Sequence, residues 1–294
     1  MVYSPLEMLH QATNEGNITV PFHQPLKVAD DRARRVSVRV RLFQAILAAA
    51  SLTFVTQLYG ADVRVISGGG AQNVLQILTP KFESATGNKA DLSFGVVGTI
   101  QQKLTAGEKA DILILPVPLL DGLEKAGVFR ARSRTVLGRI SIGVVVRDGA
   151  GAIDISSNEA VRNMLLESRS VVFPDPKLTP SGTHLMRVFA QMDILDKMQP
   201  KITFRNAIDG GINLVRDGQV EIGLFLVTEI LPVKGIRLVG TLPPALQGYV
   251  VYGAAVSADS GLPDTASRFV EFLSDPGMRE HWKAAGFEPS NGGN

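Results

Sequence analysis

The strongest constraint on the fold is a glycine-rich turn at 63–74, with the sequence VRVISGGGAQNV. A β-branched, apolar run ends in three glycines, and a helical pattern follows at once, with Val74, Leu75, Leu78 and Phe82 at helical spacing. Glycines allow a sharp turn and a close approach to the backbone, and the first turn of a helix presents free N–H groups at its positive end. The turn therefore predicts an anion site, or alternatively a tight turn with nothing bound.

Strand and helix patterns alternate along the rest of the chain. Two short helices, 265–273 and 276–285, are expected at the end of the chain, with Phe269, Phe272 and Trp282 packing on the core. This alternation predicts α/β architecture with mostly parallel sheets and helices on both faces. Ligands in such folds bind beyond the carboxyl ends of the strands. Strands are expected at 63–67, 90–94, 111–116, 140–147, 171–173, 201–206, 221–227 and 248–256.

Composition excludes several kinds of chemistry. The 294 residues contain no cysteine, which excludes zinc–thiolate sites, thiol catalysis and disulfides. Only four histidines are present, and two of them, His10 and His23, precede the first strand. No metal ligand pattern, phosphate-binding loop or Ser-His-Asp spacing occurs, so we expect neither a metal nor a cofactor.

The first 61 residues are interpreted as a leader. Five arginines between 32 and 41 precede a mostly apolar run at 42–58, and the small residues Gly60 and Ala61 follow, as in a signal peptide. An N-terminal membrane anchor is the alternative. The leader contains six of the 30 basic and four of the 28 acidic residues, which leaves the remainder formally neutral. We therefore expect an exported, monomeric protein in the periplasm, with no nucleic-acid partner.

From about Val63 to Pro289 the order of motifs resembles the periplasmic molybdate-binding protein family of ABC transporters. The matching segments are the glycine turn, 104–114, Asp175-Pro176 with the 180–183 segment, and 223–229. The resemblance implies a type II periplasmic binding fold, a small anionic ligand held between two lobes, and an ABC transporter permease as partner. It assigns residues 62–146 and 249–294 to lobe I and residues 147–248 to lobe II, with crossover strands near 140–147 and 249–256.

The resemblance does not extend to the hydroxyl groups that hold the oxyanion in that family. The corresponding positions are Gly70, Val97 or Gly98, and Leu226, none of which has a hydroxyl. A desolvated dianion needs its polar partners, so these changes disfavour molybdate and tungstate. Bare backbone donors and a roomier site favour a larger anion, such as a carboxylate.

The chain is also similar to aconitate isomerase, an enzyme on the same scaffold. A binding protein is the first hypothesis, and an isomerase of a small polycarboxylate is the alternative; only there does His184 act as a catalytic acid or base. Arg205 is expected to pair with the ligand's charge, whereas Asp175 and Glu229 are expected to position loops. The predicted ligand-binding residues are Ser67, Gly69, Gly70, Ala71, Gly98, Thr99, Ser181, Gly182, Thr183, His184, Arg205 and Asn206.

Overall fold

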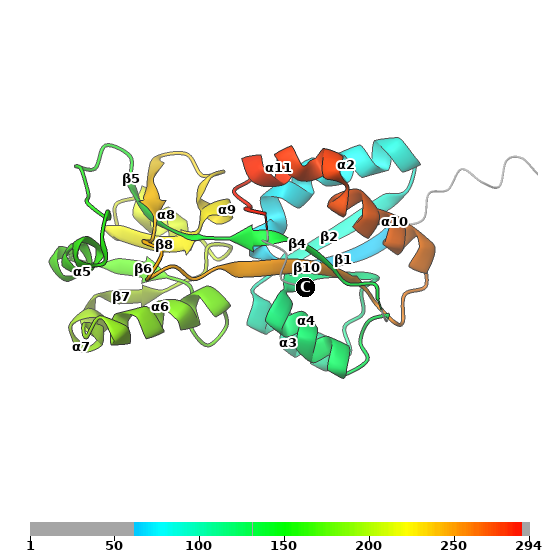
Figure 1. The fold of residues 1–294 in the computed structure, drawn as a ribbon, viewed down its shortest axis with the longest axis horizontal. Helices are drawn as coiled ribbons and strands as arrows, with labels where there is room; N and C mark the ends of the chain where they lie inside the picture. The colour runs from blue at the N-terminus through cyan, green and yellow to red at the C-terminus, as the bar shows by residue number, and fades with distance from the viewer. Residues whose placement is uncertain (1–61, 131, 290–294) are drawn as a thin grey trace, which may run out of the picture. The chain divides into compact units, whose positions relative to one another are not determined.

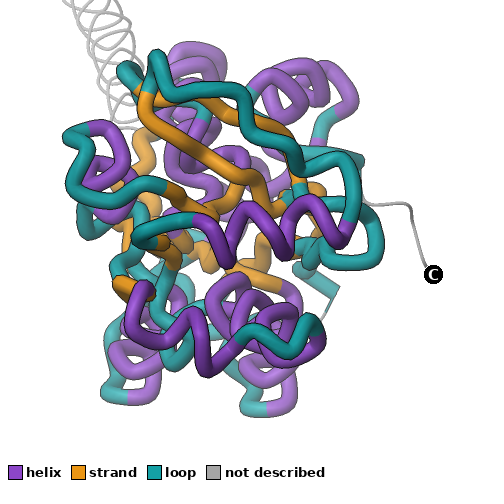
Figure 2. Tube along the Cα trace, turned by 90° about the vertical axis from the view of Figure 1, so that its left-hand side faces the viewer, coloured by secondary structure: helices purple, strands orange, loops and turns teal. Residues whose placement is uncertain are grey.

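Residues 62–130 and 132–289 are described by a computed structural model, and they form two α/β lobes, each built on a five-stranded sheet (Figure 1). Helices lie on the outside of the strands (Figure 2). None of the helices in these two ranges has the length and apolar character that crossing a membrane requires. The predicted leader, residues 1–61, lies outside the described residues. The two-lobe α/β fold predicted from the sequence is confirmed.

The first sheet has the strand order β2-β1-β3-β10-β4. Strand β10 runs antiparallel to both neighbours, whereas the other four strands share one direction. Its strands are β1 (Asp62–Gly68), β2 (Lys89–Gly95), β3 (Ile112–Pro116), β4 (Thr135–Ile140) and β10 (Val250–Val256). Its helices are η1 (Gly69–Ala71), α2 (Gln72–Thr86), α3 (Val97–Thr105), α4 (Val117–Lys125), α10 (Pro263–Ser274), η3 (Pro276–Met278) and α11 (Arg279–Ala284).

The second sheet has the strand order β7-β6-β8-β5-β9, and β5 runs against the other four strands. The lobe boundaries expected from the sequence place residues up to 146 in lobe I, whereas β5 pairs within this second sheet. Its strands are β5 (Ile142–Arg147), β6 (Val171–Phe173), β7 (Ile202–Phe204), β8 (Ile222–Leu226) and β9 (Ile236–Thr241). Its helices are α5 (Asn158–Glu167), α6 (Pro180–Gln191), α7 (Leu195–Met198), η2 (Gln199–Lys201), α8 (Gly211–Arg216) and α9 (Val227–Ile230).

Helix α2 follows the glycine turn because its apolar side chains recur at helical spacing and are fully buried. It ends at Gly87, whose φ of 73° is readily adopted by glycine. Phe82 on α2 packs edge-on against Phe269 of α10, with ring centroids 4.8 Å apart. Phe269 and Trp282 are buried and Phe272 packs on Phe82, which confirms the expectation that the last helices cover the core.

The chain crosses between the lobes twice, and the two crossings are tied together. Strands β4 and β5 are separated by the single residue Ser141, and the return crossing leads into β10. The Gln247 side chain accepts a hydrogen bond from the Ile142 N–H at 2.8 Å and donates one to the Ile142 carbonyl at 3.1 Å. Glu288, near the end of the described chain, accepts from Ser141 Oγ at 2.8 Å and from Arg139 Nε at 3.1 Å. These bonds hold the two crossings and the end of the described chain together.

Candidate functional site

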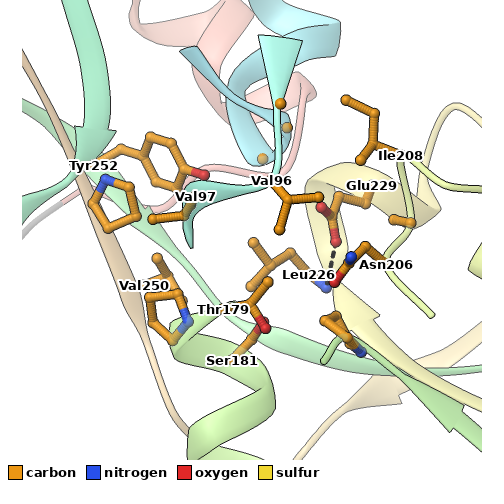
Figure 3. A pocket seen from close by; sticks show the side chains of 17 residues that line it. Val96, Val97, Thr179, Ser181, Asn206, Ile208, Leu226, Glu229, Val250 and Tyr252 are labelled. Carbon is orange, nitrogen blue, oxygen red and sulfur yellow. Dashed lines mark hydrogen bonds between the residues drawn. The ribbon is translucent and has the colours of Figure 1, made fainter. Parts of the chain in front are cut away.

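A small cavity lies between the lobes, where the glycine turn meets the second lobe (Figure 3). We call it the central cavity. Its volume of about 30 Å³ is enough for only one or two water molecules. The structure is therefore closed. Its lining residues are Gly69, Gly70, Gly95, Val96, Val97, Pro116, Pro174, Thr179, Pro180, Ser181, Asn206, Ala207, Ile208, Leu226, Glu229, Val250 and Tyr252.

The first lobe contributes backbone rather than side chains at the glycine turn. Gly68 precedes η1 in an extended conformation and supplies no side-chain cap, and the backbone of Gly69 and Gly70 lines the cavity. Tyr252, on β10, fills the space that the glycines leave. A Cβ atom at Gly68 would lie 2.6 Å from the Tyr252 hydroxyl, and one at Gly70 would lie 2.9 Å from it.

The Tyr252 hydroxyl is held in its neutral form. Burial raises the pKa of this hydroxyl, the Glu229 carboxylate raises it further, and a hydrogen bond with the Gly70 backbone lowers it in part. A neutral phenol both donates and accepts hydrogen bonds, so Tyr252 is able to respond to a ligand at the turn.

The second lobe contributes the start of α6, which is largely satisfied by its own side chains. Thr179 caps the helix, because its hydroxyl oxygen accepts from the Gly182 N–H at 3.2 Å. Pro180 occupies the next position and has no N–H to offer. Ser181 is buried and lines the cavity. Little of this helix terminus is left for a ligand beyond Ser181.

Glu229, on α9, is the ionisable group of the second lobe that faces the cavity. One carboxyl oxygen accepts from the Leu226 N–H at 3.3 Å, and the other lies 3.6 Å from the position of a Cβ at Gly69. Burial raises the pKa of the Glu229 carboxyl to about 7, although the Leu226 N–H lowers it in part. Near neutral pH this group is poised to gain or lose a proton.

No positive side chain lines the central cavity. Within the described residues, its lining contains no Lys, Arg or His. In the same ranges, no group of three or more His, Asp or Glu side chains is arranged to hold a metal ion. Any anion in this cavity would depend on hydrogen-bond donors rather than on ion pairs.

Four of the predicted ligand residues line the central cavity: Gly69, Gly70, Ser181 and Asn206. Asn206 is also tied to its own loop, because its side chain accepts from Asp175 N–H at 3.2 Å and donates to Asp209 at 2.8 Å. Thr99 lies outside and lines a neighbouring side pocket. The glycine turn and the start of α6 do converge, as their positions after strands predict.

Five other predicted ligand residues serve the fold in this structure. Ser67 and Ala71 are buried, and Ser67 Oγ donates to the neighbouring Gly68 carbonyl. Gly98 donates its N–H across the cleft to the Leu178 carbonyl at 2.8 Å, so it closes the lobes rather than facing the cavity. Gly182 packs so tightly that a Cβ would lie 2.3 Å from the Pro174 carbonyl oxygen. Thr183 is exposed and its hydroxyl donates to Pro176 and Thr179 carbonyls.

The two predicted charged or titratable ligand contacts, His184 and Arg205, also lie outside the cavity lining. His184 Nε2 lies 2.9 Å from the Leu246 carbonyl oxygen, and its ring packs against Gly248 on the return crossing. Arg205 is exposed, and its Nε donates to the Asp209 carbonyl at 2.7 Å. In this structure the Arg205 side chain bonds its own loop, and the carboxylate clamp stays a prediction.

Sequence reasoning missed Tyr252 and assigned Glu229 only to loop positioning. Tyr252 belongs to no sequence motif, because a single tyrosine within a predicted strand does not by itself indicate a functional role. The signal available was the alternation of Gly68 with Gly70, since two residues lacking side chains on one side of a turn leave room for a bulky neighbour. For Glu229, the burial that raises its pKa arises where α9 packs against η1, a contact distant in the sequence.

Two larger side pockets adjoin the central cavity, and Ile208 lines all three spaces. One pocket, of about 340 Å³, contains Lys103, Thr99 and Asp209. The other, of about 320 Å³, is reached past Gly69 and Glu229 and contains amide side chains. The amides are Gln72, Asn73, Gln76 and Asn213.

Comparison with known families gives one match that spans most of the chain. Residues 63–288 match the model of a family described as bacterial extracellular solute-binding protein. Among individual relatives, an aconitate isomerase from Pseudomonas sp. is 29% identical over 231 residues, covering 76% of this chain and 87% of that protein. The molybdate-binding protein ModA of Escherichia coli K12 is 23% identical over 228 residues, covering 76% of this chain and 88% of ModA.

Solved structures share the fold. The periplasmic molybdate-binding protein of Azotobacter vinelandii superposes with a TM-score of 0.68 at 19% identity, covering 78% of this chain and all of that chain. At such identity the likeness concerns the arrangement of lobes and strands, and it leaves the contents of the cavity to be argued from the residues themselves.

Proposed function

The chain belongs to the family of bacterial extracellular solute-binding proteins, in the group that resembles the molybdate-binding protein ModA, and on this premise we propose that it captures a small carboxylate anion between its lobes. As a carrier, it acts as a monomer in the periplasm and delivers the ligand to an ABC permease. The basic-then-apolar pattern of residues 1–61 supports export. Closure of the lobes around the ligand is the step that the permease recognises.

The observation that carries this proposal is the glycine turn, whose uncapped start at Gly69 and Gly70 lines a cavity between two lobes. Helix N-termini of this kind bind anionic groups through N–H donors and the helix dipole. Because the closed cavity holds only one or two waters, a ligand must enter an open form and then be enclosed.

A carboxylate fits the lining better than a tetrahedral oxyanion. The positions that carry hydroxyl groups in the molybdate-binding family are Gly70, Val97 or Gly98, and Leu226 here, and none of them has a hydroxyl. The side pockets extend the cavity in two directions. A planar carboxylate needs fewer donors per anionic group than a dianion with four oxygens. The 29% identical relative named for aconitate supports the same class of ligand.

Thermal unfolding with candidate ligands tests the proposal, because a ligand that binds only the native state raises the melting temperature. We expect trans-aconitate or succinate to raise it in a concentration-dependent way, and molybdate and sulfate to have little effect. If no di- or tricarboxylate shifts the melting temperature, the carboxylate proposal is wrong. If molybdate alone shifts it, the ligand is a tetrahedral oxyanion instead.

A second candidate is an isomerase of a small polycarboxylate, favoured by the placement of Glu229 and Tyr252. These side chains come from opposite lobes and approach adjacent glycines, Gly69 and Gly70, of the same turn. A carboxylate with a pKa of about 7 suits a general base, and a neutral phenol suits a hydrogen-bond donor. In such a reaction the base removes a proton from one carbon, the double bond shifts, and a proton returns to the other carbon.

Proton NMR of trans-aconitate incubated with the protein separates the candidates. Formation of cis-aconitate by the parent, lost in Glu229→Gln, would establish the isomerase. Binding without turnover would establish a carrier.

A further inference from the structure

We propose that Glu229 makes ligand capture proton-coupled: a small carboxylate enters with one proton from solvent, and the protonated Glu229 donates a hydrogen bond to it. The inference rests on the proposed carboxylate function and names Glu229 as the group that determines specificity. It predicts a site that favours ligands with an anionic oxygen free to accept this hydrogen bond.

The first support is geometric. Glu229 lines the central cavity from the second lobe (Figure 3). One carboxyl oxygen is used by the Leu226 N–H, whereas the other faces the turn near Gly69. A ligand carboxylate that enters beside Gly69 therefore meets that second carboxyl oxygen. A hydrogen bond between two carboxyl oxygens needs a proton on one of them.

Among the residues that the structure describes, no Lys, Arg or His side chain lines the cavity to offset the charge of Glu229. Helix α9 packs on η1, β5, β8 and β9, and η1 and β8 contain no charged residue. On β5, Arg147 lies beside Gly218, and on β9, Arg237 donates to the Ala150 and Gly151 carbonyls. Neither arginine lines the cavity.

The remaining neighbours of Glu229 are neutral or engaged elsewhere. Tyr252, across the turn, is a neutral phenol. In the adjoining loop, Asp209 accepts from Asn206 and Arg205 donates to a backbone carbonyl. An ionised Glu229 would thus meet an incoming carboxylate with no positive charge between them.

In an enclosed site, protonating Glu229 costs less free energy than keeping both Glu229 and the ligand carboxylate ionised. Repulsion between two ionised carboxylates is strong where water is excluded. Burial already raises the pKa of Glu229 to about 7, so an added anion raises it further. In an open form the carboxyl is hydrated and its pKa returns toward the ordinary value, so closing on a ligand takes up a proton.

Isothermal titration calorimetry measures this proton directly. The parent protein is titrated with trans-aconitate and with succinate, both fully ionised at pH 7.5, in phosphate and in Tris, which differ in heat of ionisation. We expect an uptake approaching one proton per ligand bound. We also expect affinity to weaken up to about tenfold for each pH unit between pH 7 and 8.

Two variants test whether Glu229 is the group that takes up the proton. Glu229→Gln retains an oxygen for the Leu226 N–H and keeps a donor for the ligand, so it should bind with affinity that changes less than about twofold with pH and with no proton uptake. Glu271→Gln removes an equal charge from the exposed face of α10 and should behave as the parent does. Circular dichroism confirms that each variant is folded.

The outcomes separate this inference from the function on which it rests. If the parent binds a carboxylate without taking up a proton, or if Glu229→Gln takes up the same proton, proton coupling is wrong and carboxylate capture stands. If no carboxylate binds to the parent, the proposed function fails first and proton coupling fails with it. Should Glu229→Gln fail to fold, the buffer and pH dependence of the parent still decides.

Discussion

Two helix N-termini meet at the central cavity, and they differ in whether a side chain caps their free N–H groups. At the start of η1, Gly68 supplies no side-chain cap, the Gly70 backbone hydrogen-bonds the Tyr252 hydroxyl, and both Gly69 and Gly70 line the cavity. At the start of α6, Thr179 caps the Gly182 N–H, and Pro180 removes another donor. An uncapped terminus is available to a ligand, whereas a capped one stabilises its own helix.

This difference assigns separate tasks to the lobes. The first lobe offers backbone donors and a neutral phenol, which suit an anionic group. The second lobe offers Ser181, Asn206 and the titratable Glu229. In the proposed function, recognition of negative charge thus belongs mainly to the first lobe, and the response to pH belongs to the second. Four substitutions test this division, from the largest expected effect to the smallest.

Gly70→Val should reduce affinity for trans-aconitate by at least about 100-fold, or roughly 3 kcal/mol. A Cβ at Gly70 would lie 2.9 Å from the Tyr252 hydroxyl and 3.1 Å from Leu226 Cδ1, so the branched side chain fills the cavity. Calorimetry measures the loss. Gly69→Ala is the matched control, since its Cβ finds ordinary contacts at 3.6 Å and beyond. Equal affinity in Gly70→Val and the parent would mean that the glycine turn is not part of the binding site.

Glu229→Gln should stabilise the ligand-free protein at alkaline pH. The native pKa, raised from 4.5 to about 7, means that the folded state holds more protons than the unfolded state in this window. The free energy of unfolding of the parent therefore falls as pH rises from 4.5 to 7, and above pH 7 the full cost remains, about 1–3 kcal/mol. Urea unfolding at pH 5 and pH 8 should show the variant gaining relative stability only at pH 8. A constant difference would contradict a buried, titrating carboxyl.

Thr179→Ala should lower the free energy of unfolding by about 0.5–2 kcal/mol, because α6 loses its cap. Ligand affinity should change less than about threefold, since this terminus serves the helix rather than the anion. Urea unfolding and calorimetry report the two quantities, and Thr179→Ser, which keeps the capping oxygen, should restore stability. A large loss of affinity with unchanged stability would reverse the roles of the two termini.

Arg205→Ala should have the smallest effect, with affinity for trans-aconitate within about twofold of the parent. The side chain is exposed and bonded to its own loop, and an exposed interaction of this kind contributes little. Calorimetry under the same conditions measures the affinity of the variant and of the parent for trans-aconitate. A tenfold or greater loss would mean that Arg205 reaches the ligand when the lobes close on it, and charge recognition would then be shared by both lobes.

The fold was predictable because buried strands and glycine turns follow one another in a fixed order. The second-lobe contacts were harder to predict, and the 181–183 segment shows why. A serine-glycine-threonine run after proline reads equally well as a ligand loop or as a capped helix start. The difference depends on Thr179, whose hydroxyl meets Gly182, and on the Pro174 carbonyl, which leaves no space beside Gly182. Tyr252 reaches the turn only through pairing of β10 with β3, a contact distant in the sequence.

The position of β10 inside the first sheet has a consequence for how the polypeptide folds. Strands β5 to β9 come from one continuous segment, so the second lobe can form as soon as that segment is available. The first sheet stays incomplete until β10 is delivered, because β10 lies between β3 and β4. Loop closure over such a distance slows folding. Until then β3 and β4 each keep an open edge, and a nascent or truncated chain lacking residues 250–256 presents two strands that can pair with another chain and aggregate.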